Sequence, residues 1–329
     1  MKSRLQLAGL SAALVTTAAQ AEVKINDNLA VSGYAVAALT LTDPDSGDTS
    51  GSQFNSGKGN YDAVKFAVTG NYNDLSGKVS VFYFPVDESD GEDTAGILDA
   101  YATYTAGSVS ITGGKFLSYL GYEAFDPINM TTITYGNSWN PIPAYHTGGK
   151  IDFAGEGFAV GASVTDQLYT APEEFIGGDG DFSNGLGYEF IASFTGIEKL
   201  TVFTGVGFEV LDDAEDQFVF DIWASYAVSD SLTIAGEYSY ADNAFGSSIV
   251  TDYWALFATY TASETVSVTG RVSAVLNDEA GSQFTIAPTY TLTENFSLRG
   301  ELTYSDSDQS SVQVGSKGMF YAVQGVFKF

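Results

Sequence analysis

Apolar and polar residues alternate with a period of two over much of the chain. The alternation is most regular in the second half, for example over 232–240, 266–276 and 296–304, where every second residue is apolar or glycine. A period of two places successive side chains on opposite faces of a strand. From Leu29 onward about sixteen such segments follow one another, and most are near the roughly 9 to 11 residues that a tilted strand needs to cross a bilayer.

Short and long connections alternate between these segments. The short ones are 73–76, 106–108, 154–157, 196–199, 229–231, 263–265 and 294–295, and the longer or more acidic ones are 42–60, 85–96, 117–146, 168–184, 212–216, 242–248, 278–282 and 306–318. An outer-membrane barrel has short periplasmic turns at one end and longer extracellular loops at the other. The pattern therefore predicts an all-β fold, a transmembrane antiparallel β-barrel of about sixteen strands with both chain ends on the periplasmic side.

A secreted β-sandwich or jelly roll is the alternative, because it also combines short strands with turn residues. Two features favour the barrel. Tyr and Phe recur at the ends of the apolar faces, as in the aromatic girdles of membrane barrels, and the last segment alternates from Met319 to the terminal Phe329.

The first residues have the composition of a secretory leader. Lys2 and Arg4 precede a moderately apolar run from Leu7 to Ala19, and the cleavage-site pattern Ala19-Gln20-Ala21 follows. This order predicts a signal peptide over 1–21 and a barrel over 22–329. A membrane-spanning helix is the alternative, but the run is shorter than the ~20 apolar residues that a span needs, and no other run approaches that length.

Composition and charge narrow the function classes. The chain has no cysteine, which excludes disulfides and cysteine-based metal or catalytic sites. It has 41 acidic and 13 basic residues, a net charge of −28, and loss of the leader removes two of the basic ones. Such a charge repels phosphate backbones, so we expect no nucleic-acid partner.

The stretch 117–146 interrupts the alternation. It carries three of the seven prolines, the only histidine, and the acidic residues Glu123 and Asp126. A connection of this length is usually either functional or disordered, and its many aromatic residues favour an ordered loop.

The same region contains short motifs in a family order. Gly114-Lys115-Phe116, Gly121-Tyr122-Glu123, Asp126-Pro127 and His146-Thr147-Gly148 resemble the GKF, GYE, P and HTG succession of the OmpL-like family of β-barrel porins. The resemblance implies an outer-membrane porin-type barrel. In general porins the third long loop folds inward, and 117–146 is the third long connection, so we expect it to be a constriction loop. A lid over the mouth or a trimer contact is the alternative.

Candidate constriction residues follow from the strand faces. The inward face carries the cations Lys65, Lys78, Lys150, Arg271 and Arg299 and the acids Asp99, Asp152, Glu189, Glu209, Asp221, Glu237 and Glu301. We predict a constriction formed by Lys115, Glu123, Asp126, Lys150, Arg271 and Arg299, with the loop acids opposite Lys150 or Arg271. Lys115 shares the apolar face with Ile111, so this role requires a bulge at Gly113-Gly114. The alternative is that these charges only hydrate the wall and pair with one another.

Metal and catalytic sites are weakly indicated. Clustered carboxylates at Asp43, Asp45, Asp48, Asp87, Asp90 and Asp93 are candidate calcium ligands, but neither run completes a helix-flanked calcium loop. Solvated acidic loops, or loops that bridge lipopolysaccharide through divalent ions, are the alternatives, and no other cofactor is expected. The single histidine, His146, has no nucleophile or acid arrangement near it in sequence, so we expect a structural role and no enzyme.

The sequence therefore predicts an outer-membrane channel. We expect passive diffusion of small hydrophilic solutes or ions with a cation preference, contact with outer-membrane lipid and lipopolysaccharide, and a homotrimer as one assembly. A non-conducting adhesin or structural barrel with ligand-binding or calcium-binding acidic loops is the second hypothesis, and a secreted soluble β-protein is the third.

Overall fold

The computed structural model describes residues 22–45, 50–53, 61–84, 94–169, 180, 182–183, 185–211, 215–246, 251–276, 281–307 and 317–329. The strands are β1 (Glu22–Asn26), β2 (Leu29–Pro44), β3 (Ser50–Gln53), β4 (Ala63–Tyr72), β5 (Leu75–Phe84), β6 (Thr94–Ala106), β7 (Val109–Leu117), β8 (Tyr145–Gly155), β9 (Phe158–Thr165), β10 (Gly185–Ile197), β11 (Leu200–Leu211), β12 (Gln217–Ser229), β13 (Leu232–Asp242), β14 (Thr251–Thr261), β15 (Val266–Val275), β16 (Gly281–Thr293), β17 (Phe296–Ser307) and β18 (Gly318–Lys328). The described residues also include three short 3-10 helices, η2 (Pro127–Asn129), η3 (Asn137–Trp139) and η4 (Ala244–Gly246). No helix among the described residues is long and apolar enough to cross a membrane.

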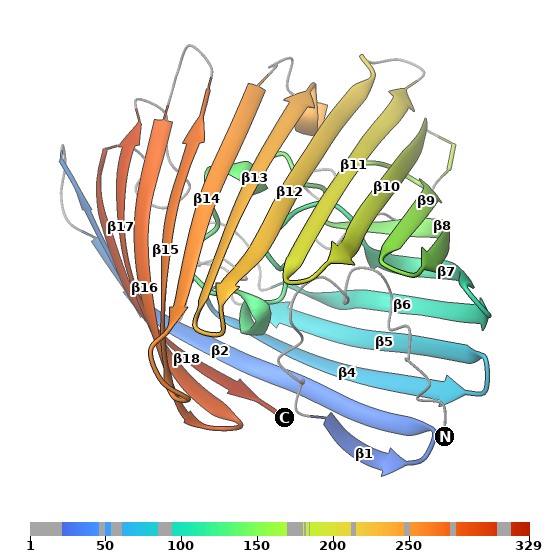
Figure 1. Ribbon diagram of the computed structural model, residues 1–329, viewed down its shortest axis with the longest axis horizontal. Helices are drawn as coiled ribbons and strands as arrows, with labels where there is room; N and C mark the ends of the chain where they lie inside the picture. Colours follow the sequence, from blue (N-terminus) through green and yellow to red (C-terminus); the bar gives the residue numbers. More distant parts are fainter. Residues whose placement is uncertain are drawn as a thin grey trace.

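The strands form one closed antiparallel barrel (Figure 1). From β4 to β18 each strand pairs with the next, β2 pairs with β4, and β18 pairs back with β2. The short strands β1 and β3 add to β2, which leaves sixteen strands in the wall itself. The predicted fold and strand number are confirmed. The β1 strand before Leu29 was not predicted, because its five residues all remain exposed and carry no buried face.

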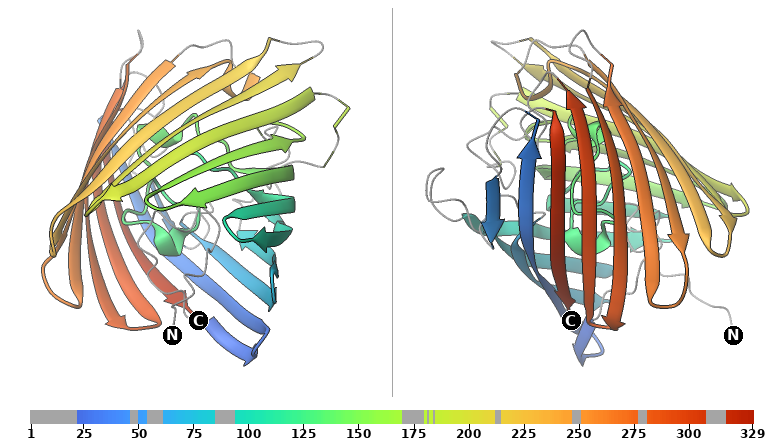
Figure 2. Two further views of the ribbon diagram at one scale, coloured as in Figure 1. Left: turned by 45° about the vertical axis from the view of Figure 1, so that its right-hand side comes forward. Right: turned by 90° about the vertical axis from the view of Figure 1, so that its left-hand side faces the viewer.

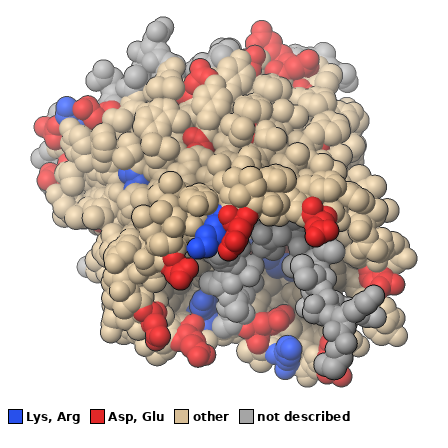
Figure 3. Space-filling view, viewed as in Figure 1, with Lys and Arg blue, Asp and Glu red and all other residues tan. Residues whose placement is uncertain are grey.

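The two faces of the wall differ in the predicted way. Outward residues such as Ile97, Ile151 and Leu256 are apolar and exposed, whereas inward residues include the buried charges Glu189 and Arg271. In Figure 3 a broad part of the outer wall has no charged side chains. Acidic side chains lie along its upper rim. This is the division expected when lipid surrounds the wall and polar groups line the interior.

One irregularity in β6 places two successive residues on the inner side. The pairing of β5 with β6 shifts between Val79 and Val81, and Leu98 and Asp99 are both buried. A bulge of this kind lets two residues of one strand oppose one residue of its partner. It places the Asp99 carboxylate within 3.1 Å of the Lys65 ammonium on β4.

The seam joins the two ends of the barrel. Phe329 accepts a hydrogen bond from the Gly33 N–H at 2.9 Å and donates its own N–H to the Gly33 carbonyl at 3.0 Å. A Cβ on Gly33 would lie 2.6 Å from the Lys65 carbonyl oxygen and 2.7 Å from the Phe329 ring. Glycine is therefore needed where the last residue packs over β2.

Gly114 is a second position that requires glycine, and Gly114→Ala should weaken the wall. Its φ is +125°, and a Cβ would lie 2.2 Å from the Ala100 carbonyl oxygen. We expect the free energy of unfolding in urea to fall by about 1–3 kcal/mol. The matched control is Gly113→Ala, where a Cβ meets nothing within 4 Å and the change should stay within about 0.5 kcal/mol. Equal effects of the two substitutions would contradict this assignment of strain.

Candidate pore constriction

A single segment, residues 118–144, contacts the inner face of the wall from many sides. Its ends lie together, because the Ser118 N–H donates to the Ala144 carbonyl at 2.6 Å. Figures 1 and 2 show the segment, in green, within the ring of strands. Its contacts reach β2, β4, β8, β10, β12, β13, β15 and β17. We call it the lumen segment.

An ion pair joins the lumen segment to β15. Arg271 Nη1 lies 2.8 Å from Glu123 Oε1, and both side chains are nearly inaccessible to solvent. The guanidinium also donates to Thr132 Oγ1 at 3.1 Å, to Thr134 Oγ1 at 2.8 Å and to the Thr134 carbonyl. Arginine suits this position because its planar fork can satisfy several acceptors at once.

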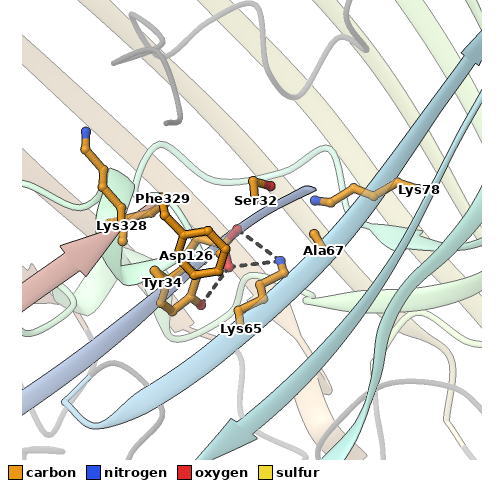
Figure 4. Close-up of a pocket in the computed structure, with 10 residues that line it drawn as sticks. Ser32, Tyr34, Lys65, Ala67, Lys78, Asp126, Lys328 and Phe329 are labelled. Atoms are coloured by element: carbon orange, nitrogen blue, oxygen red, sulfur yellow. Dashed lines mark hydrogen bonds and ion pairs between the residues drawn. The ribbon is translucent and has the colours of Figure 1, made fainter. Parts of the chain in front are cut away.

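A second charged network lies against β2, β4 and β5 (Figure 4). Lys65 Nζ lies 3.0 Å from both carboxylate oxygens of Asp126, and the Tyr34 hydroxyl donates to the same carboxylate at 3.0 Å. Lys65 and Lys78 both pair with Asp99, at 3.1 and 3.0 Å. The two loop acids are therefore held by cations from different strands.

Other wall carboxylates bind backbone N–H groups of the lumen segment. Glu237 accepts from the Tyr122 N–H at 2.6 Å, Asp221 from the Gly121 N–H at 2.8 Å, and Glu301 from the Ile133 and Thr134 N–H groups at 2.5 and 3.2 Å. A buried hydrogen bond of this kind typically contributes about 0.5–1.5 kcal/mol. These inward acids orient the backbone of the segment.

Three more wall acids accept hydrogen bonds, two from the start of the lumen segment and one from the connection between β9 and β10. Asp152 accepts from the Tyr119 hydroxyl and Glu189 from the Ser118 hydroxyl. Glu209 accepts from the Leu168 N–H at 2.8 Å.

His146 is fully buried at the exit of the lumen segment. Its Nε2 lies 3.4 Å from Glu189 Oε1, and its ring meets the Phe116 ring edge-on. The Ser118 hydroxyl donates to Glu189 and not to the imidazole. Among the residues that the structure describes, Ser118 is therefore not paired with this histidine as a nucleophile with its base.

Apolar contacts fix the segment on both sides of the lumen. Tyr119, Leu120 and Ile142 pack with a buried cluster on β10 to β12 that includes Phe203 and Trp223. Phe125 and Ile128 pack against Tyr34, Val36, Phe82, Leu98 and Val326 on the other side. Burial of each large apolar side chain contributes roughly 1.5–3 kcal/mol.

Some of the candidate residues predicted from the sequence contact partners other than those predicted. The structure brings Glu123 to Arg271, one of the two cations that the strand faces offered, but it brings Asp126 to Lys65 and not to Lys150 or Arg271. Lys150 Nζ instead lies 4.8 Å above the Phe116 ring and 4.5 Å above the Tyr119 ring. Arg299 Nη1 donates at 3.2 Å to the carbonyls of Pro127 and Thr132 and to the Gln324 side chain.

The bulge proposed for Lys115 is wrong. Both pairings of β7 run without a register shift through Gly113 and Gly114, and Lys115 pairs with Ala100 and Thr147. Lys115 therefore keeps the outward parity of Ile111. Glycines at 113 and 114 allow a bulge but do not require one, and an unbroken ladder leaves fewer unpaired backbone groups.

Burial controls the ionisation of the loop acid. Desolvation raises the pKa of Glu123, and the Arg271 guanidinium and the Gly136 N–H oppose that rise. Removal of the arginine would leave the desolvation uncompensated.

Sequence reasoning placed Lys65, Asp99, Asp221, Glu237 and Glu301 on the inner face but did not assign them to the candidate site. The available signal was the excess of acids over cations on the inward parity, together with a lumen segment that contains no cation. The seven named inward acids outnumber the five named inward cations. The remaining acids need other donors, and the backbone of a folded-in segment supplies them.

The calcium candidates are mostly outside the described part of the chain. Asp48, Asp87, Asp90 and Asp93 are not among the described residues, whereas Asp43 and Asp45 are. Among the residues that the structure describes, no three His, Cys, Asp or Glu side chains are arranged to hold a metal ion.

Comparison with known families decides the class of the protein. The family model "Putative beta-barrel porin-2, OmpL-like" matches residues 52–329. The chain belongs to this family. It is thus a member of a porin-type family of outer-membrane β-barrel channels, as the motifs around the lumen segment suggested. No curated protein matches it by sequence.

Solved structures share the fold at low sequence identity. OmpF of Salmonella typhi in complex with daunomycin is 14% identical with a TM-score of 0.67, and covers 94% of this chain and 100% of its own. The anion-selective porin of Comamonas acidovorans is 14% identical with a TM-score of 0.66, covering 92% and 99%. A trimer form of OmpT of Vibrio cholerae is 12% identical with a TM-score of 0.64, covering 92% and 100%.

Proposed function

We propose that the protein is a passive diffusion channel for small hydrophilic solutes or ions, narrowed by the lumen segment. The observation that carries the proposal is the closed sixteen-strand wall with an apolar outer face and a charged inner face. Barrels of this size leave an aqueous interior, whereas eight-stranded barrels are filled by their own side chains.

The constriction is formed, in this proposal, between the two charged networks. Glu123 and Arg271 stand on one side of the lumen segment, and Asp126, Lys65 and Asp99 on the other. Lys150 and Arg299 complete the inner lining. Rings of fixed charge set selectivity in pores because they favour or oppose the entry of a hydrated ion.

The channel should prefer cations. The inward wall carries more acids than cations, and the lumen segment adds Glu123 and Asp126 without any cation. Reversal potentials across a planar bilayer under a KCl gradient measure this directly, and we expect the sign set by potassium permeation. A potential set by chloride would refute the cation preference and leave conduction itself standing.

A second function is favoured by one observation. Ile133, Thr134 and Ser138 of the lumen segment have no solvent-exposed surface. Packing this tight suits a non-conducting adhesin or structural barrel whose lumen is plugged. The same bilayer recording separates the two functions, because a plugged barrel inserts without producing conductance steps.

We further propose a homotrimer in the outer membrane. The support is the size of the barrel and its likeness in fold to OmpT of Vibrio cholerae, for which a trimer form is known. Cross-linking in native membranes would give a trimer band, and a band no larger than the monomer would refute this assembly.

A further inference from the structure

The inner face of β11 to β16 changes character toward the end of the barrel where the short turns lie. These strands stand side by side in the wall (Figure 1). Their inward charged residues are all buried, namely Glu209, Asp221, Glu237 and Arg271. Three of these four contact the lumen segment. Closer to the turns, the inward positions carry hydroxyl or apolar side chains and no charge. Partly exposed hydroxyls among them are Thr201, Ser225, Thr233, Thr259, Ser267 and Thr289.

These six hydroxyls form a belt because they meet across neighbouring strands. The cross-strand pairs are Thr201 with Ser225, Thr233 with Thr259, and Ser267 with Thr289. The Thr259 hydroxyl also lies 3.0 Å from that of Thr269, which continues the row from β14 to β15. A hydroxyl group can donate and accept a hydrogen bond, and it rotates to suit its partner. We call these six residues the hydroxyl belt.

Tyr122 of the lumen segment borders the hydroxyl belt. Its ring centroid lies 5.4 Å from that of Trp223 and 4.8 Å from that of Phe257. Those two wall residues precede Ser225 and Thr259 by two positions, on the same faces of β12 and β14. Trp223 and Phe257 are buried, whereas Tyr122 is only partly buried. An aromatic ring that solvent can reach therefore adjoins a row of hydroxyl groups.

Trp223 adds a hydrogen-bond donor without an acceptor. Its side chain is only 5% exposed, and its indole Nε1 has no hydrogen-bond partner among the described residues. A buried N–H group left without an acceptor is costly, and most such groups in proteins are paired. A bound molecule that carries hydroxyl groups would supply the missing acceptor beside the belt.

We propose that the hydroxyl belt and Tyr122 form a binding subsite for a neutral sugar ring in transit through the lumen. The inference rests on the proposed channel function and names a solute class for it. A sugar ring has C–H groups on its faces and hydroxyl groups around its edge. The faces pack on the Tyr122 ring, while the edge exchanges hydrogen bonds with the belt and accepts one from the Trp223 N–H.

The charge distribution favours a neutral solute at this subsite. The acids of β12 and β13 already accept hydrogen bonds from the lumen segment, and Arg271 is paired with Glu123. An ion that shed its water beside the belt would find no opposite charge there, which is unfavourable. A sugar exchanges its hydrogen bonds with water for equivalent ones with hydroxyls, and so it binds weakly enough to leave again.

The test is the effect of maltose on the ion current through the full-length protein in planar bilayers. Maltose should reduce the wild-type current in a saturable manner. Sorbitol, a polyol without a ring, should lower it only as far as it lowers the conductivity of the solution. Tyr122→Leu should weaken maltose binding about tenfold, because it removes the stacking surface. The double variant T233V/T259V preserves side-chain shape, removes two hydroxyls and should also weaken binding about tenfold.

The matched controls are Tyr260→Leu and Thr204→Val, which change the same residue types on the outer face of β14 and β11. Both should bind maltose like the wild type. T233V/T259V tests the belt even if Tyr122→Leu shifts the lumen segment. Equal effects of maltose and sorbitol on the wild-type current would overturn the subsite and leave the channel function standing, as would equal maltose binding by T233V/T259V and Thr204→Val. A wild-type protein without conductance steps would refute the channel function and the subsite together.

Discussion

Replacing residues 119–143 by an Asn-Gly turn is expected to raise single-channel conductance severalfold. The lumen segment contacts the wall from β2 to β17, so its removal should leave a wider aqueous path. The design is geometrically simple because the Ser118 N–H already bonds to the Ala144 carbonyl, and a two-residue turn closes such a hairpin. Conductance steps in planar bilayers provide the measurement.

The control places the same Asn-Gly turn at 230–231, between β12 and β13, where the connection is already two residues long. Its conductance should equal that of the wild type. Unchanged conductance in the shortened protein would mean that the lumen segment does not limit the current. The shortened protein must still show heat-modifiable mobility, since it loses the apolar contacts with Phe203 and Trp223.

Replacing Arg271 with methionine is expected to lower the free energy of unfolding by about 3–5 kcal/mol, as for other buried pairs that lose one partner. The substitution leaves the Glu123 carboxylate buried without its cation and removes the donors to Thr132 and Thr134. Urea unfolding in lipid-containing micelles measures the loss. The double variant E123Q/R271M should recover part of it, because the uncompensated charge is then absent.

The control for Arg271→Met is Lys199→Met. Lys199 pairs with Asp230 at 3.8 Å, but both side chains are exposed, and such surface pairs contribute about 0–1 kcal/mol. If Arg271→Met lowered the free energy of unfolding no more than Lys199→Met, the large contribution assigned to the buried pair would be contradicted. A double variant less stable than Arg271→Met alone would contradict it as well.

Local pattern predicted much of the barrel because a strand has only two faces. The period of two over 232–240 and 266–276 specified β13 and β15 and separated lipid-facing from inward residues. The lengths of the connections, such as the two-residue link before β17, ordered the strands in sequence. Both signals are contained within a few neighbouring residues.

The partners across the lumen could not be predicted in the same way. Asp126 reaches Lys65, 61 residues away, and Glu301 reaches the backbone of Thr134, 167 residues away. Parity states which face a residue occupies but not its height or its angle around the barrel, which depend on tilt and stagger. The bulge at Leu98 and Asp99 changes parity within one strand, and the sequence gives no signal for it.

The pairing of β2 with β18, which continues to Gly33 and Phe329, also affects the order in which the barrel assembles. Every other ladder of the wall joins strands that are near neighbours in the chain, whereas this one joins β2 to the final strand. Bringing such distant segments together carries the largest loop-closure entropy in the molecule and slows their pairing. Closure of the cylinder therefore depends on β18 reaching β2, the pairing in the wall that we expect to form most slowly.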